Sequence, residues 1–155
     1  MSFTFNSGTY AANAPTTCSI KTYSGHYLTA VGGGGRITDV IHSDAKKVRS
    51  WEKFTLIDPG VGVPIPYGIK TATGNYLTAV GGGGRITDVI HSDATRQLDW
   101  EKFTLISLGG GYYAIQTFKG NYLTAVGGGG RITDVIHSDA TQINAWEKFF
   151  FTCGL

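Results

Sequence analysis

A run of glycines near the start of the chain is followed by a small set of polar residues. The candidate binding residues are the last two glycines of the run and four polar residues after it: Gly34, Gly35, Arg36, Asp39, His42 and Asp44. A carboxylate accepts hydrogen bonds from neighbouring hydroxyls, a neutral imidazole donates or accepts one, and a guanidinium offers several fixed donors. Glycines let a ligand approach the backbone and leave N–H groups exposed. The residue types therefore predict a small site for a hydroxyl-rich ligand such as a sugar.

The same residues recur twice more in the chain. The equivalents are Gly83, Gly84, Arg85, Asp88, His91 and Asp93, and then Gly129, Gly130, Arg131, Asp134, His137 and Asp139. They belong to the stretch YLTAVGGGGRITDVIHSDA, which is identical in all three copies (Tyr27–Ala45, Tyr76–Ala94 and Tyr122–Ala140). Folding requires a hydrophobic pattern of the right size and not identity. Identity of the polar members therefore indicates that their side chains are in use. A recent duplication is the alternative, and it predicts differences scattered over the whole repeat.

Other chemistry has weaker support from the same residues. The spacing Asp39-x-x-His42-x-Asp44 lacks a second His or Cys, so neither a metal nor another cofactor is expected. The glycine run lacks the Gly-Lys-Ser/Thr ending of a phosphate loop. Asp and His can transfer protons, but three equal catalytic sites in one small chain would be unusual. Threefold equivalence instead predicts a multivalent binding protein that is not an enzyme.

The repeats themselves define the elements that position these residues. Tyr27, Tyr76 and Tyr122 mark a period of 49 and then 46 residues. One domain over residues 1–155 is expected, with repeats at about 18–57, 67–107 and 113–153 and an N-terminal extension at 1–17. β-Branched and aromatic residues predict four strands per repeat. In the first repeat these are Ser19–Thr22, Tyr27–Val31, Arg36–His42 and Trp51–Ile57.

Three units of four strands predict an all-β fold, the β-trefoil, with a six-stranded barrel capped by three hairpins. A three-bladed propeller would fall below the usual four blades. The expected core consists of Ile20, Leu28, Ile37, Trp51, Phe54 and Leu56 with their repeat mates. For Trp51, a sugar-stacking platform is the alternative. Strand alternation places Asp39 on the face of Ile37 and Ile41, so a β-bulge is expected to redirect it towards the site.

Composition limits the partners and the compartment. A net charge of +2 with 15% charged residues argues against nucleic acid as a partner. No apolar run approaches the roughly 20 residues of a membrane-spanning helix, so membrane insertion is not expected. No signal peptide is recognisable at the N-terminus, and a cytoplasmic protein that is released on cell damage is expected. Cys18 and Cys153 are interpreted as free buried thiols, although the neighbouring first and last strands of a trefoil leave a bridge open.

Two stretches of each repeat carry a family resemblance. The residues Lys21-Thr22 through Ala30, followed by glycines and Trp51-Glu52-Lys53-Phe54, resemble the fascin-like and hisactophilin-like branch of the β-trefoil superfamily. The Gln-x-Trp signature of ricin-type lectins is absent. Overall the chain is similar to the small cytoplasmic β-trefoil lectins of mushrooms. That resemblance implies a fungal haemagglutinin that binds galactose- or N-acetylgalactosamine-containing glycans and forms a homodimer.

Two other functions stay open at this stage. The fascin-like pattern implies an actin-binding or bundling module, which would depend on basic residues such as Lys46, Lys47 and Arg49 that only the first repeat has. A protease inhibitor would use one asymmetric loop, such as Asp58–Pro66. Histidine side chains titrate near pH 6.5, so a sugar site that needs neutral imidazoles predicts binding that changes between pH 5 and 8.

Overall fold

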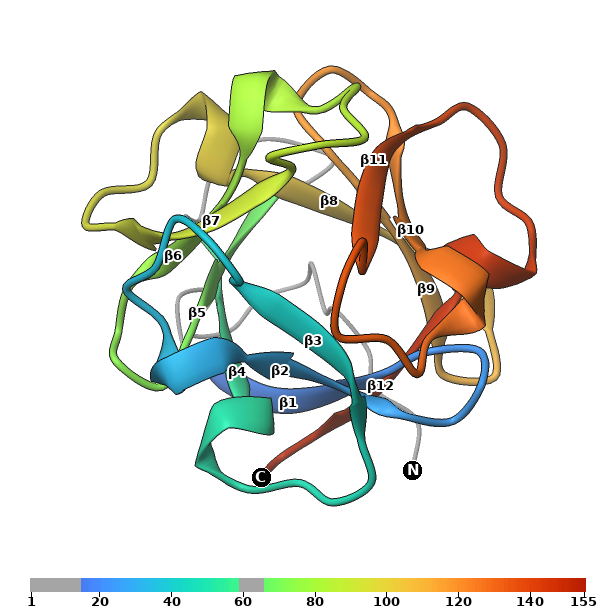
Figure 1. Cartoon of the computed structure of the whole chain (residues 1–155), viewed down its shortest axis with the longest axis horizontal. Helices are drawn as coiled ribbons and strands as arrows, with labels where there is room; N and C mark the ends of the chain where they lie inside the picture. The colour runs from blue at the N-terminus through green and yellow to red at the C-terminus, as the bar shows by residue number, and fades with distance from the viewer. Residues whose placement is uncertain (1–14, 59–65) are drawn as a thin grey trace, which may run out of the picture.

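The computed structural model describes residues 15–58 and 66–155, and six of its strands close into a barrel (Figure 1). Around the barrel, each strand pairs antiparallel with the next, and the last pairs with the first. In barrel order the strands are β1 (Thr16–Lys21), β4 (Phe54–Ile57), β5 (Pro66–Lys70), β8 (Phe103–Gly109), β9 (Tyr112–Gln116) and β12 (Phe149–Cys153). The predicted all-β architecture is confirmed.

Three hairpins, one from each repeat, extend from this barrel. They pair β2 (Tyr27–Ala30) with β3 (Ile41–Ala45), β6 (Tyr76–Ala79) with β7 (Ile90–Ala94), and β10 (Tyr122–Ala125) with β11 (Ile136–Ala140). Figure 1 shows β3, β7 and β11 arranged around the centre of the molecule. Short 3₁₀ turns connect the strands: η1 (Val31–Gly33), η3 (Val80–Gly82) and η5 (Val126–Gly128) within the hairpins, and η2 (Ser50–Glu52), η4 (Asp99–Glu101) and η6 (Ala145–Glu147) before the last strand of each repeat.

The core is formed by the inward-facing residues of all three repeats. Phe54, Phe103 and Phe149 are completely buried, and Ile20, Leu28 and Leu56 lie beside them. Four of the six core positions predicted in the first repeat are therefore confirmed, namely Ile20, Leu28, Phe54 and Leu56. A buried carboxylate holds each hairpin to the turn that follows it, because Glu52 accepts a hydrogen bond of 2.7 Å from Thr29 Oγ1 and another of 2.9 Å from the backbone N–H of Arg49.

Two predicted core residues and their mates are exposed, so those predictions were wrong. The side chain of Ile37 is 55% exposed, because the expected strand Arg36–His42 does not form and the extended strand begins only at Ile41. Trp51 is 48% exposed, because it lies in the turn η2 and not in the last strand. The mates Ile86, Ile132, Trp100 and Trp146 are exposed in the same way.

The cysteine prediction was also wrong. Cys18 and Cys153 form a disulfide between paired positions of β1 and β12, which are the first and last strands of the barrel. The predicted neighbourhood of these strands is correct, and it is what brings the two thiols together. Most of the N-terminal extension and of the Asp58–Pro66 loop lies outside the described residues. Among the residues described, no helix has both the length and the apolar character needed to cross a membrane.

Candidate functional site

The glycine run joins each repeat to the next one. Gly34 lies against Thr71 of the following repeat so closely that a Cβ on this glycine would overlap the threonine hydroxyl. The Gly33 carbonyl accepts a hydrogen bond from the Thr73 N–H at 2.9 Å, and the Gly35 N–H donates to the Ser92 carbonyl at 2.7 Å. Two of the glycines predicted to serve a ligand thus have a structural role. The Gly35 N–H, and its equivalents in Gly84 and Gly130, are bonded within the protein.

A buried serine completes each contact between repeats. The backbone N–H of Ser92 donates to the Arg36 carbonyl at 2.8 Å, and the Ser92 hydroxyl accepts from the Arg36 N–H at 3.0 Å. Ser138 makes the same bonds to Arg85, and Ser43 makes them to Arg131, which closes the ring of three repeats. These glycine and serine contacts are called the joints below. They give a structural reason for the identity of the glycines and the serine in the three repeats.

The candidate side chains that project from the joints form one exposed cluster in each repeat. Asp39 Oδ1 forms a hydrogen bond of 2.7 Å with His42 Nε2. Asp39 Oδ2 lies 3.9 Å from a guanidinium nitrogen of Arg36. The side chains of Arg36, Asp39 and His42 are 40%, 52% and 26% exposed. These clusters are called the polar trios, and the other two are Arg85–Asp88–His91 and Arg131–Asp134–His137.

An unusual backbone conformation aims the aspartate of each trio. Asp39, Asp88 and Asp134 have a φ of 49°, and they are the described non-glycine residues with positive φ. Aspartate tolerates this left-handed region better than most residues, and residues held there cluster at functional sites. The left-handed turn ends the strand pattern expected for Arg36–His42, so Asp39 points to His42 instead of sharing a face with Ile41.

The β-bulge expected at Asp39 was wrongly placed, because the bulge of this hairpin lies further along the chain. Thr29 pairs with His42 and Tyr27 with Ala45, so β3 contains one extra residue between these two pairs. Asp44 occupies this bulge and is exposed, as are Asp93 and Asp139 in the other repeats. The bulge thus turns the Asp44 side chain outwards beside the trio. The positive φ turns the Asp39 side chain outwards.

An exposed tryptophan lies beside each site, although the sequence favoured a core position for it and left a sugar-stacking platform as the alternative. Trp51 packs its indole edge on Gly33, where a Cβ would lie 3.3 Å from the indole nitrogen. The Arg36 side chain covers the preceding Gly32, where a Cβ would lie 3.6 Å from Cδ. Tryptophan and trio therefore flank the same two-glycine turn. The absence of a Cβ at both glycines is the sequence signal that could have indicated this arrangement.

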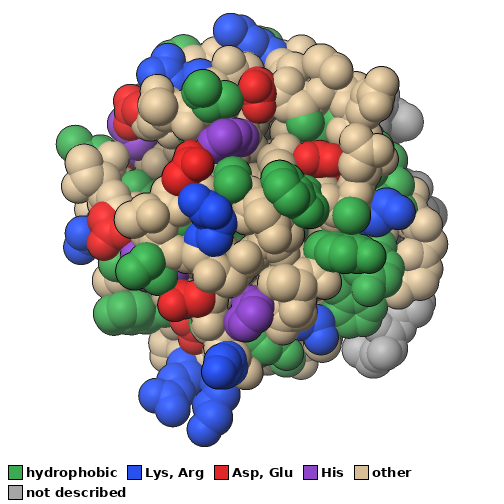
Figure 2. All heavy atoms as spheres, turned by 45° about the vertical axis from the view of Figure 1, so that its right-hand side comes forward, with side chains coloured by type: hydrophobic (Ala, Val, Ile, Leu, Met, Phe, Trp, Pro, Cys, Tyr) green, Lys and Arg blue, Asp and Glu red, His purple; other side chains and the backbone are tan. Residues whose placement is uncertain are grey.

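The charges of the site come from the trios themselves. On the face shown in Figure 2, acidic, basic and histidine side chains lie next to one another at several points. In residues 15–58 and 66–155, no three His, Cys, Asp or Glu side chains gather closely enough to hold a metal ion.

Burial raises the pKa of Tyr113, a core residue of β9, and a hydrogen bond with Ser107 opposes this effect.

Comparison with known proteins identifies the fold. No protein-family model matches the sequence, and no curated protein matches it either. Among solved structures, the designed threefold-symmetric protein ThreeFoil is similar with a TM-score of 0.72 and 14% identity, over 88% of this chain and 97% of that one. The chain is a β-trefoil protein. Larger glycoside-cleaving enzymes also contain a similar part, and this chain covers 26–33% of three such enzymes.

Two natural lectins share this β-trefoil fold. The Rhizoctonia solani agglutinin is similar with a TM-score of 0.69 and 15% identity, over 87% of this chain and 92% of that one. The Polyporus squamosus lectin, solved with the human-type influenza-binding epitope Neu5Acα2-6Galβ1-4GlcNAc, is similar with a TM-score of 0.67 and 12% identity, over 92% of this chain and 50% of that one. At these identities the likeness concerns the fold, so the function must be argued from the site.

Proposed function

We propose that this β-trefoil protein is a multivalent lectin with one equivalent site in each repeat. The observation that carries the proposal is the polar trio, which has the same geometry three times: a carboxylate–imidazole distance of 2.7 Å in every copy and a guanidinium–carboxylate distance of 3.8–3.9 Å. The joints account for the glycines and the serine of the identical stretch, whereas the Arg, Asp and His side chains of the trios bond mainly to one another on a partly exposed surface. A ligand bound by all three copies accounts for them.

The trio offers the donors and acceptors that a monosaccharide needs. When His42 Nε2–H donates to Asp39, the opposite ring nitrogen is an acceptor for a sugar hydroxyl, and Asp39 Oδ2 is an acceptor for a second. The Arg36 guanidinium donates to the Thr38 carbonyl through Nε at 3.2 Å, which fixes its plane while leaving further N–H groups for the ligand. Asp44 adds another carboxylate, and the exposed indole face of Trp51 suits the apolar face of a galactose-type ring.

Three weak sites on one rigid protein can bind a glycan-coated surface with high avidity. A single exposed site of this kind binds a simple sugar at about millimolar, or about 4 kcal/mol. Simultaneous engagement of several sites raises the avidity by roughly 100-fold or more. We therefore propose binding of galactose- or N-acetylgalactosamine-containing glycans and agglutination of cells that carry them, without catalysis. A homodimer would double the number of sites, and cytoplasmic storage until cell damage would fit defence.

Removal of the three histidines tests the proposal. We expect the triple variant His42→Ala, His91→Ala, His137→Ala to lose haemagglutination and to bind immobilised galactose at least tenfold more weakly. The matched control is Lys46→Ala, Thr95→Ala, Thr141→Ala, which changes equivalent exposed residues that differ between the repeats. Both proteins should unfold at nearly the temperature of the unchanged protein. If the histidine variant agglutinates as well as the control, the site is wrongly assigned. Actin co-sedimentation without any glycan binding would instead support the fascin-like function.

A further inference from the structure

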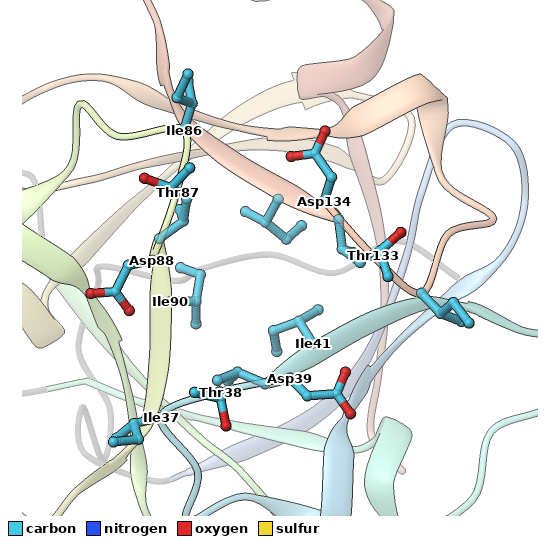
Figure 3. A pocket seen from close by; sticks show the side chains of 15 residues that line it. Ile37, Thr38, Asp39, Ile41, Ile86, Thr87, Asp88, Ile90, Thr133 and Asp134 are labelled. Carbon is cyan, nitrogen blue, oxygen red and sulfur yellow. The ribbon is translucent and has the colours of Figure 1, made fainter.

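The three hairpins enclose a hollow between the three single sites, each of which contributes its aspartate to the wall. Its volume is about 670 Å³, and each repeat contributes five consecutive residues to its wall. These residues are 37–41, 86–90 and 132–136, which form the bend before β3, β7 and β11 and the first residue of each strand. Figure 3 shows the three segments facing one another around a common centre. One hollow is therefore shared by three repeats.

The inside of this hollow is apolar. Ile41 and Ile90 point into it in Figure 3, whereas the carboxylates of Asp39, Asp88 and Asp134 point away from its centre. The direction of these carboxylates follows from the polar trios, in which each one bonds to a histidine at 2.7 Å outside the hollow. Ile37, Ile86 and Ile132 extend the apolar surface beyond the mouth, because their side chains are 54–55% exposed.

The shape of the hollow selects the kind of occupant. A volume of about 670 Å³ lies within the range of roughly 300–1,000 Å³ for small-molecule pockets, which are also lined mainly by apolar side chains. A second copy of the chain is a poor occupant, because a twofold contact places the same patch on both sides. Two such hollows facing each other would trap an empty space. An anion would find no basic side chain in the wall, and the three wall carboxylates are already bonded to histidines, so a charged ligand would lose its hydration without gaining a free partner charge.

We propose that this axial hollow binds one uncharged apolar small molecule per protein molecule, beside the three sugar sites, which share only the three aspartates of its wall. The ligand is a compact hydrocarbon or aromatic body of drug-like size, held by Ile41, Ile90 and Ile136 from three sides. The stoichiometry follows from the position: the hollow lies between the repeats, so it accepts one ligand, whereas the polar trios accept three.

Titration with Nile red, an uncharged apolar dye, tests the proposal without any sugar present. We expect saturable binding with one dye per chain. We also expect each single variant Thr38→Trp, Thr87→Trp and Thr133→Trp to raise the dissociation constant at least tenfold, because one bulky side chain at the wall obstructs a shared hollow. Thr95→Trp is the control, since Thr95 is exposed and does not line the hollow.

Several outcomes would overturn this proposal. A stoichiometry of three, or a loss of only one third of the capacity in each single variant, would place the dye in the individual repeats. Unsaturable binding, or binding equal in Thr38→Trp and Thr95→Trp, would show that the hollow is not the site. A dimer that dissociates in Thr38→Trp would show that a second copy covers this face, and co-sedimentation with phosphatidylcholine vesicles would show that a lipid surface does. The thermal unfolding of every variant confirms that it is folded.

Discussion

The identical stretch of each repeat contains two regions that are equally unchanged but have different surroundings. In the joints, Gly34 and Ser43 lie against the neighbouring repeat, and every polar group contributed by Ser43 bonds to Arg131 or Gly130. In the polar trios, Arg36, Asp39 and His42 bond mainly to one another and face the solvent. The contact between repeats explains the identity of the joints, and the proposed ligand would explain the identity of the trios. Structure separates them where sequence cannot.

The largest expected effect concerns the disulfide that links the first and last strands of the barrel. The disulfide between Cys18 and Cys153 links positions 135 residues apart. In the chain-entropy account, a loop of this length stabilises a protein by about 4–5 kcal/mol, through restriction of the unfolded chain. We expect reduction, or the double variant Cys18→Ala, Cys153→Ala, to lower the free energy of unfolding in urea by about that amount. Unchanged stability after verified reduction would contradict this.

A substitution within a joint should come next. Gly34→Ala places a methyl group on Thr71 and forces a φ of 117° on alanine, so we expect a loss of about 3–5 kcal/mol. Gly25→Ala is the matched control, because Gly25 has a φ of 93° but open space around its Cβ position. Strain alone should cost it about 1–2 kcal/mol. Equal losses in the two variants would show that the close contact between repeats contributes nothing.

Two neighbouring residues in β3 sharpen the comparison further. Ser43 is completely buried in a joint, whereas the next residue, Asp44, is exposed beside a trio. We expect Ser43→Ala to cost about 1–2 kcal/mol of stability, because the Arg131 N–H loses an acceptor, and to leave sugar binding unchanged. Asp44→Ala should change stability by less than about 0.5 kcal/mol. Made in all three copies, at Asp44, Asp93 and Asp139, the exposed change should weaken sugar binding, as measured on immobilised galactose.

The exposed tryptophans should contribute little to stability and more to binding. The triple variant Trp51→Ala, Trp100→Ala, Trp146→Ala removes rings that are 46–48% exposed, so each copy should cost about 1 kcal/mol or less. Galactose binding should nevertheless fall about tenfold, since the stacking surface is lost. The variant with phenylalanine at the three positions retains a flat ring and should recover part of the affinity. Unchanged binding in the alanine variant would remove tryptophan from the site.

The sequence predicted the barrel strands correctly, but it did not predict the turns at Ile37–Asp39 and at Trp51. Threefold repetition and the apolar positions of Ile20, Leu28 and Phe54 predicted the trefoil and its core, because strand patterns are local. The error at Ile37 arose because Asp39 adopts a left-handed conformation that a pattern of alternating residues does not reveal. At Trp51, a short 3₁₀ turn replaced the start of the predicted strand.

The joints could not be predicted from the sequence for another reason, and the disulfide remained there only an open alternative to free thiols. Both depend on contacts between residues far apart in the chain, such as Gly34 with Thr71 and Cys18 with Cys153. The glycines were interpreted as a ligand-facing loop because their partners in the next repeat could not be known. The polar residues of the site stay a prediction, although the structure brings Arg36, Asp39 and His42 together in every repeat.

The most direct test of the two explanations of identity is a glycan array with the protein and with its triple variant Asp39→Asn, Asp88→Asn, Asp134→Asn. Asparagine has nearly the shape of aspartate and tolerates positive φ, so the variant removes the three carboxylate charges and replaces one acceptor oxygen in each copy by an NH₂ donor. We predict that the unchanged protein binds galactose- or N-acetylgalactosamine-terminated glycans, and that the variant keeps its free energy of unfolding within about 1 kcal/mol while its array signal is lost. A blank array for the unchanged protein, or an undiminished signal for the variant, would contradict the account.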